Sequence, residues 1–149
     1  MTEKEIGDTI IASALKVHTA LGPGLLESAY ETCLLYELQK QRLPVRQQVL
    51  IPVRYEDFTI DNGYRVDLLV GDRVVVELKA LEAILPVHRA QLLSYLRLGR
   101  FKLGYLLNFN VVHARRHCQA GQWPLRIHCV HRGTSATTAL KLFFGGSDA

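Results

Sequence analysis

The most constraining feature of this sequence is a pair of apolar runs, 65–70 and 74–79, which flank a glycine turn and nevertheless contain ionisable residues. Runs rich in valine and leucine on both sides of a short turn predict a β-hairpin. Asp67 lies in the first run, and Glu77 and Lys79 lie in the second. Burying each charge singly would cost several kcal/mol, so these side chains must satisfy one another or a ligand.

The register of this hairpin decides whether the charges meet. Glu77 and Lys79 share one face, because residues two apart on a strand point the same way. A two-residue loop at 71–72 would place Asp67 opposite an apolar residue, whereas a three-residue loop at 71–73 would place it opposite Glu77. We predict the second register or an equivalent bulge, because two carboxylates around a divalent cation, with an ammonium nearby, would satisfy all three charges.

The rest of the chain predicts a single α/β domain over 1–132 and a C-terminal tail over 133–149. Apolar residues at three- and four-residue steps predict two N-terminal helices that pack as an antiparallel pair, and Thr2 with Glu5 forms a capping box before the first. The predicted helices span 3–21, 25–41 and 86–98, and the predicted strands span 47–55, 58–70, 73–80, 102–109 and 125–131. The tail, rich in Thr, Ser, Ala and Gly, is predicted to be loosely attached.

Composition excludes several classes of protein. The chain has 149 residues, of which 48% are hydrophobic and 21% are charged, which is typical of a globular protein. No apolar run approaches the ~18 residues that cross a bilayer, and the first residues do not resemble a signal peptide. Three widely spaced cysteines favour a reducing compartment. We therefore expect a cytoplasmic protein with no membrane partner.

Charge is unevenly distributed along the chain. Residues 1–75 carry 8 Lys/Arg and 11 Asp/Glu, whereas residues 76–149 carry 10 and 3, so the formal total of +4 comes from the second half. A basic half weakly favours a polyanionic partner such as nucleic acid.

Asp67 on one strand, followed by Glu77-Leu78-Lys79 on the next, resembles the signature of the PD-(D/E)xK nuclease superfamily. The run 24–30, with Gly24, Glu27 and Tyr30, is similar to the G-x-x-E-x-x-Y pattern that names a small bacterial family within it. Further blocks resemble that family in the same order, and the resemblance covers about 5–112. These blocks are Leu21-Gly22-Pro23-Gly24, Gly63-Tyr64-Arg65-Val66-Asp67, Gln91-Leu92-Leu93-Ser94-Tyr95 and Leu107-Asn108-Phe109-Asn110.

The resemblance implies a restriction-endonuclease-like core, with a mixed sheet flanked by helices, and a nuclease that hydrolyses DNA with Mg²⁺ or Mn²⁺. Asp67 and Glu77 would bind the metal ion with a main-chain carbonyl such as that of Leu78, because hard cations prefer oxygen ligands. Lys79 would orient or deprotonate the attacking water and offset negative charge. Glu27 would add a further carboxylate, either to a second metal ion or behind the first ligands.

The third predicted helix carries two more candidate residues. Gln91 and Tyr95 lie four apart, so they project together and would contact the phosphate or brace the site. The alternative is a polar seam between helix and sheet. Arg97 and Arg100 fall at least about 100° away from this pair, so a solvated helix face is favoured over contact with a flanking nucleic-acid backbone.

Three alternatives remain open from the sequence. The first is a zinc site in the segment that contains His113, His117, Cys118, His128, Cys129 and His131, although the spacing is poor and a basic edge is favoured. The second is a catalytically silent module on the same fold that binds nucleic acid or protein. The third concerns the oligomeric state. A homodimer is compatible with this chain length, since cutting two strands often takes two sites in this superfamily.

Overall fold

The computed structural model describes residues 1–110, 124–131 and 139–144. Its elements are α1 (Glu3–Leu21), α2 (Glu27–Lys40), β1 (Val45–Tyr55), β2 (Phe58–Val70), β3 (Val74–Lys79), α3 (Pro86–Leu98), β4 (Leu103–Asn108), β5 (Pro124–His131) and β6 (Ala139–Phe144). Each predicted helix and strand is present, with ends that differ by two residues or fewer. β6 lies within the segment for which the sequence predicted only a tail.

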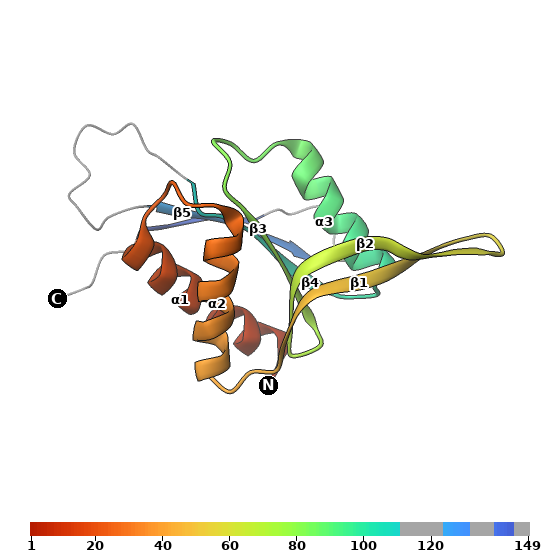
Figure 1. Ribbon diagram of the computed structural model, residues 1–149, viewed down its shortest axis with the longest axis horizontal. Helices are drawn as coiled ribbons and strands as arrows, with labels where there is room; N and C mark the ends of the chain where they lie inside the picture. The colour runs from red at the N-terminus through yellow and green to blue at the C-terminus, as the bar shows by residue number, and fades with distance from the viewer. Residues whose placement is uncertain (111–123, 132–138, 145–149) are drawn as a thin grey trace.

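The strands form one mixed sheet in the order β1-β2-β3-β4-β5-β6. β3 and β4 are parallel, and every other neighbouring pair is antiparallel. The parallel step is the one that α3 connects, as expected for a crossover through a helix. The predicted α/β fold with a mixed sheet is confirmed, and Figure 1 shows α1 and α2 on one face of the sheet and α3 on the other.

Both faces of the sheet are buried by helices. α1 presents Ile6, Ile10, Ala14 and Val17 to the larger apolar core, at the spacing that the sequence predicted. α3 presents Leu92 and Leu96 to a second core on the opposite face. The central strand β3 is buried on both sides, which explains its uninterrupted apolar run in place of an alternating one.

The predicted capping box begins α1. The Glu5 amide donates to the Thr2 side chain at 3.2 Å, and the Thr2 amide donates to the Glu5 carboxylate at 2.7 Å. These reciprocal bonds satisfy amides that have no partner within the helix, so they fix where the first helix begins.

The hairpin of β1 and β2 extends well beyond the helices (Figure 1). Its register shifts between Ile51 and Val53, and the strands then continue to a tight turn where Tyr55 pairs with Phe58. Both aromatic side chains are more than 60% exposed. The part of this hairpin beyond Ile51 and Val53 is therefore a two-stranded ribbon outside the core. The site described below lies in the buried part of β2.

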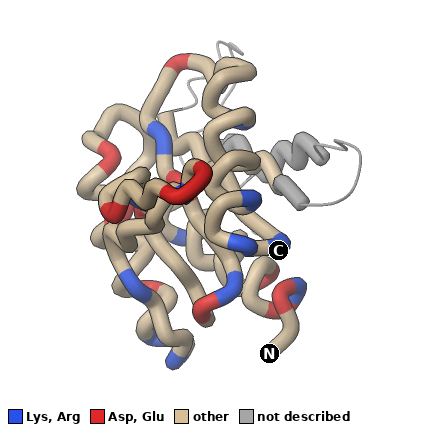
Figure 2. The backbone as a smooth tube through the Cα atoms, turned by 90° about the vertical axis from the view of Figure 1, so that its right-hand side faces the viewer, with Lys and Arg blue, Asp and Glu red and all other residues tan. Residues whose placement is uncertain are grey.

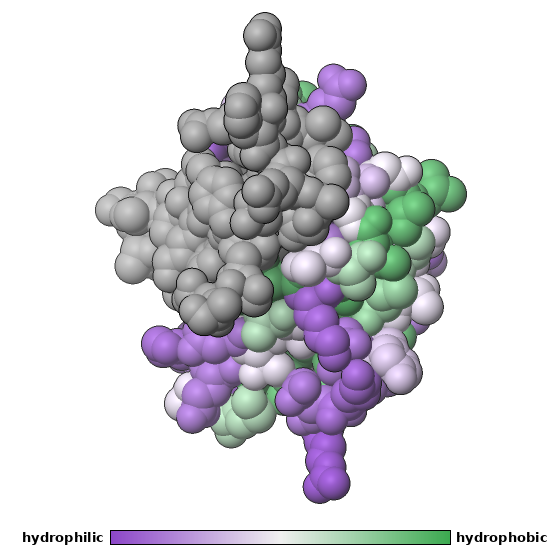
Figure 3. Space-filling view, turned by 90° about the vertical axis from the view of Figure 1, so that its left-hand side faces the viewer, coloured by the Kyte–Doolittle hydropathy of each residue, from purple (hydrophilic) through white to green (hydrophobic). Residues whose placement is uncertain are grey.

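The surface of the described residues mixes polar and apolar areas. Figure 2 shows acidic and basic residues interspersed along several elements, and Figure 3 shows hydrophobic side chains beside hydrophilic ones on one face. None of the helices in the described ranges is long and apolar enough to cross a bilayer.

Candidate active site

The β2–β3 hairpin adopts the predicted register. Val70 pairs with Val74 and Leu68 pairs with Val76, so the connecting loop has three residues, 71–73. The next step along the strands would bring Asp67 opposite Glu77. Gly71 allows this loop, because its φ of 61° is readily adopted by glycine.

The sheet opens locally at Asp67. β1 and β2 pair at Leu68 and again at Val66 but not between them, and pairing of β2 with β3 stops at Leu68. Opposite the gap, Gln48 has a left-handed φ of 53°. The break removes main-chain partners from Asp67 and creates room for side chains between the strands.

Two carboxylates fill this break and replace the missing ladder bonds. The Asp67 amide donates to Glu77 Oε1 at 3.2 Å, and the Leu78 amide donates to Asp67 Oδ2 at 2.8 Å. Glu77 is only 5% exposed, although it carries a titratable group. The structure therefore brings Asp67 and Glu77 together between the strands rather than on opposite faces.

Burial is the main cause that raises the proton affinity of the two carboxylates. Burial, and secondly the charge of Asp67, raise the pKa of Glu77 to about 8. Burial is also the main cause that raises the pKa of Asp67 above its usual range. The Lys79 charge acts in the opposite direction on both groups. A cation between the carboxylates would offset the same penalty, so the donor set suits a hard divalent ion.

Lys79 lies at the end of β3, beside this pair. Its side chain is half-buried, and no carboxylate of the described residues lies within 4.0 Å of the ammonium. The main-chain carbonyl of Lys79 accepts from the Phe109 amide at 2.9 Å, which fixes the backbone of β3 against the end of β4. The ammonium is therefore close enough to act on the carboxylates and still available to another group.

Glu27 approaches the same strand end from the first turn of α2. Its Oε1 accepts from the Ala80 amide at 3.3 Å, one residue beyond Lys79. The preceding loop is held by Tyr30, which is buried and whose hydroxyl donates to the Gly22 carbonyl at 2.6 Å. The Leu25 amide donates to that hydroxyl at 3.1 Å. Tyr30 thus packs in the core with a satisfied hydroxyl.

α3 brings Gln91 and Tyr95 to the opposite side of the carboxylates. Burial, followed by the charges of Glu77 and Asp67, raises the pKa of Tyr95, and the Gln91 side chain acts in the opposite direction. Tyr95 stacks on Tyr64 with ring centroids 4.2 Å apart. Tyr95 therefore lies near the carboxylate pair, and Gln91 lies near enough to Tyr95 to affect it.

Sequence reasoning missed three polar residues around the site. Gln48 donates to Glu31 Oε1 at 2.7 Å and to Asp67 Oδ1 at 3.4 Å. Asn108 is fully buried, and its side chain donates to the Leu81 carbonyl at 2.8 Å and accepts from the Leu81 amide at 3.0 Å. Glu31 had a signal in its spacing, since it follows Glu27 by four residues on one helix face, and Asn108 lies within one of the blocks that resemble the family.

The structure brings Asp67 and Glu77 together, and Glu27 lies at the end of the same strand β3, on the Ala80 amide. Within the described ranges, no three His, Cys, Asp or Glu side chains are placed to hold a metal ion together, and Glu27 is occupied by the Ala80 amide. The residues that fit a divalent ion are the pair Asp67 and Glu77, with main-chain oxygen and water completing the shell. Of the rival zinc ligands, His113, His117 and Cys118 lie outside the described residues.

A mixed sheet between helices, with two carboxylates and a lysine on neighbouring strands, is consistent with a restriction-endonuclease-like α/β fold. The family model of the PD-(D/E)XK nuclease superfamily matches residues 4–120, a range that contains every residue of the candidate site. The chain belongs to this superfamily. Its members usually use divalent metal ions, and membership implies a nucleic-acid substrate. Comparison with curated proteins and with solved structures gave no match.

Proposed function

We propose that this protein is a nuclease that hydrolyses phosphodiester bonds in DNA with Mg²⁺ or Mn²⁺. The observation that supports this best is the buried pair Asp67 and Glu77, held together in a break of the sheet beside Lys79. Placing two carboxylates in a low-dielectric break destabilises the fold unless a cation binds there. A structural role alone does not explain that cost.

Asp67 and Glu77 would bind the cation, together with the main-chain carbonyl of Leu78. When bound, a divalent ion in such a site polarises a phosphoryl oxygen and lowers the pKa of a coordinated water. The amides of Asp67 and Leu78 orient the two carboxylates, so the ligands are held before the ion arrives. Lys79 orients or deprotonates the attacking water and offsets the charge that develops on the phosphate.

The remaining candidates support this arrangement. Glu27 binds the main chain after Lys79 and so fixes the direction in which the lysine leaves β3. Its free oxygen is a candidate ligand for water or a second ion. Gln91 and Tyr95 offer an amide and a hydroxyl toward the carboxylates, where they would contact the scissile phosphate. The role of Tyr30 in holding the loop before Glu27 favours placement in the G-x-x-E-x-x-Y family.

The test is cleavage of linear, nicked and branched DNA with Mg²⁺, with Mn²⁺ and with EDTA. We expect wild-type cleavage that EDTA abolishes, and a loss of about 10²-fold or more for Lys79→Ala. Lys4→Ala is the matched control, since Lys4 is exposed and pairs only with Asp8 in the first turns of α1. The same samples, examined by sedimentation, give the oligomeric state, for which we propose a homodimer on double-stranded substrates.

The assay also separates the proposal from its main alternative. If the wild type and Lys79→Ala both bind DNA with a steep salt dependence and neither cleaves, the protein is a binding module on a nuclease fold. If Lys4→Ala lowers cleavage as much as Lys79→Ala, the assigned role of Lys79 is wrong.

A further inference from the structure

A groove lined by arginines lies beside the C-terminal end of α3. β1 contributes Ile51, Pro52 and Arg54, and the end of the helix contributes Arg97 and Arg100. The hollow has a volume of ≈ 450 Å³ and opens to solvent. It contains none of the candidate catalytic residues, so it is a separate feature of the surface.

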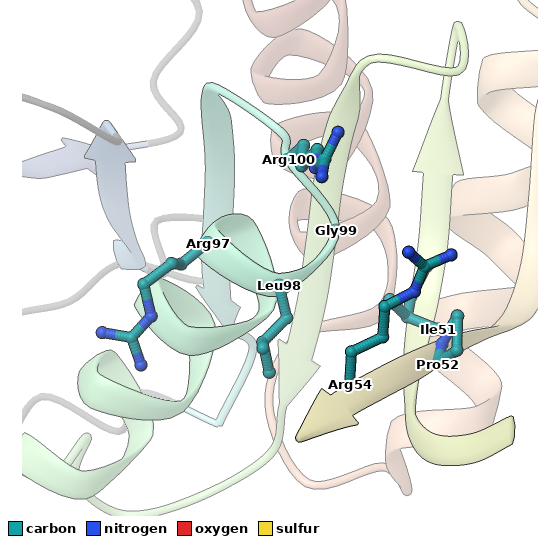
Figure 4. Close-up of a pocket in the computed structure, with 7 residues that line it drawn as sticks. All are labelled: Ile51, Pro52, Arg54, Arg97, Leu98, Gly99 and Arg100. Atoms are coloured by element: carbon teal, nitrogen blue, oxygen red, sulfur yellow. The ribbon is translucent and has the colours of Figure 1, made fainter. Parts of the chain in front are cut away.

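The arginines of this groove lack acidic partners among the described residues. The four ion pairs that the structure describes involve none of the three arginines, and no acidic residue lines the hollow. In Figure 4, Arg54 and Arg100 reach from opposite walls in a similar direction, whereas Arg97 extends away along the helix. The groove therefore presents a guanidinium group on each of two walls above an apolar floor, with a third at its margin.

A pair of stacked tyrosines joins the groove to the candidate active site. Tyr64 pairs with Ile51 of the groove floor across β1 and β2, and its hydroxyl donates to the Tyr95 carbonyl at 2.7 Å. The Gly99 amide at the groove also bonds the same carbonyl at 2.9 Å. Tyr95 in turn lies near Glu77, whose charge contributes to its raised pKa. The groove and the carboxylates thus share one side of the sheet, on either side of a single aromatic stack.

The spacing suits a nucleic-acid strand. Gly99, which caps the C-terminal end of α3, follows Tyr95 by four residues, which corresponds to about 6 Å along the helix. Successive phosphates of one strand advance ~3.4 Å along a duplex axis, so the groove lies roughly two nucleotides from the tyrosine stack. Guanidinium groups bind phosphate through two parallel hydrogen bonds, and an apolar floor strengthens such bonds by excluding water.

We propose that the groove binds the phosphodiester backbone of the substrate strand to one side of the cleavage site, with Arg54 and Arg100 as phosphate ligands. The proposal rests on the proposed function, because it assumes that the same strand reaches Asp67 and Glu77. It assigns Arg100 a role that helical geometry alone had disfavoured. Angular positions around the helix axis placed Arg100 away from Tyr95, but they could not show that β1 supplies an opposite wall facing Arg100.

The test measures DNA binding rather than cleavage. A labelled 20-nucleotide strand and a 20-base-pair duplex are titrated in EDTA at several salt concentrations, with fluorescence anisotropy as the readout. Loss of one phosphate contact lowers the slope of log affinity against log salt by about 0.7 for single strands and 0.9 for duplex. At 0.1 M salt this corresponds to binding weaker by about 5- to 8-fold for Arg54→Gln or Arg100→Gln. Arg54→Lys and Arg100→Lys retain the charge and are expected to retain the slope.

Arg42→Gln is the matched control. Arg42 is exposed and lies before the start of β1, at the other end of that strand from Arg54. It also has the same φ of 59° as Arg100, so the two substitutions impose the same backbone requirement. We expect Arg42→Gln to leave the salt slope unchanged, and circular dichroism checks that all variants are folded.

The outcomes separate this proposal from the proposed function. The groove proposal is overturned if both groove variants keep the wild-type slope, if Arg42→Gln lowers it equally, or if the wild type binds no DNA. Cleavage is measured in parallel with Mg²⁺. If cleavage depends on Lys79 and the groove variants keep the wild-type salt slope, the nuclease proposal stands and the groove proposal is wrong. If the groove variants have reduced salt slopes and the wild type shows no cleavage, the groove is a nucleic-acid binding site and the nuclease proposal is wrong.

Discussion

The main-chain amide of Asp67 donates to the side chain of Glu77 at 3.2 Å, across a point where the β2–β3 ladder stops. A carboxylate thus occupies the position that a neighbouring carbonyl takes in an ordinary antiparallel pair. The arrangement stabilises the local backbone and simultaneously places one buried acid beside another. Folding and ion binding are therefore linked at this position, and several measurable consequences follow from that linkage.

Glu77→Gln is expected to stabilise the protein without metal at alkaline pH and to abolish cleavage. The folded-state pKa of Glu77, about 8, exceeds the usual 4.5, so its stabilising contribution is full below pH 4.5 and is lost as pH rises through about 8. The amide keeps an acceptor for the Asp67 amide, and the gain at pH 9 is at most about 5 kcal/mol. Urea denaturation in EDTA at pH 5 and pH 9 measures it. Glu82→Gln, at an exposed position, should show no gain at either pH.

Mg²⁺ is expected to raise the melting temperature of the wild type but not that of Glu77→Gln. A ligand that binds only the folded state stabilises it in proportion to the logarithm of its concentration above Kd. Neutralising one carboxylate of the pair removes a charged ligand and the repulsion that the ion relieves. Thermal melts over a range of Mg²⁺ concentrations at pH 8 measure the effect. An equal rise in both proteins would show that the ion binds elsewhere.

Gln48→Ala is expected to weaken activation by Mg²⁺ by about tenfold, because Gln48 separates two acids. Its amide donates to Glu31 and, more weakly, to Asp67, so its removal leaves two carboxylates facing each other. The readout is the Mg²⁺ concentration at half-maximal cleavage, which a purely structural residue would not shift. Gln47→Ala is the control, since Gln47 is an exposed neighbour on the same strand. A fall in maximal rate alone, with the Mg²⁺ dependence unchanged, would contradict the positioning role.

The sequence predicted the elements and the hairpin register because both follow from local patterns. The valine run of β3 and the charged residues inside it left one register in which Asp67 and Glu77 could meet. Gln48 and Glu31 could not be placed in this way, because their contact joins α2 to β1 and depends on a left-handed residue within a strand. The contact between Glu27 and the Ala80 amide could not be predicted either, since no side-chain pattern reveals a main-chain partner. β6 was missed because it is an edge strand with one neighbour, and such a strand needs little regular alternation of apolar and polar residues.

Asn108→Ala is expected to destabilise the protein by roughly 2 to 4 kcal/mol and to lower cleavage. The Asn108 side chain bonds both main-chain groups of Leu81, and its Oδ1 also accepts from the Asn110 amide at 3.2 Å. Truncation leaves these groups without partners next to the segment that follows Lys79. Urea denaturation and cleavage measure the two effects. Asn110→Ala serves as the control, because Asn110 takes part through its amide, and it should retain near wild-type stability.

The stability difference between the wild type and His18→Gln is expected to change with pH below 6.5. His18 is 1% exposed, and its Nε2 donates to the Phe109 carbonyl at 3.0 Å, a bond that raises the pKa of His18 and so partly opposes the effect of burial. Burial lowers the pKa of His18 below 6.5, so the unfolded chain takes up a proton before the folded one. The contribution of His18 is therefore full above pH 6.5 and is lost as pH falls through its folded pKa, at no more than about 1.4 kcal/mol per pH unit. The Phe109 amide also donates to the Lys79 carbonyl, so losing the His18 contact with Phe109 also weakens the support of β3 at the candidate active site. Chemical denaturation of both proteins from pH 8 to pH 5 isolates the contribution of His18, and a constant difference across that range would contradict it.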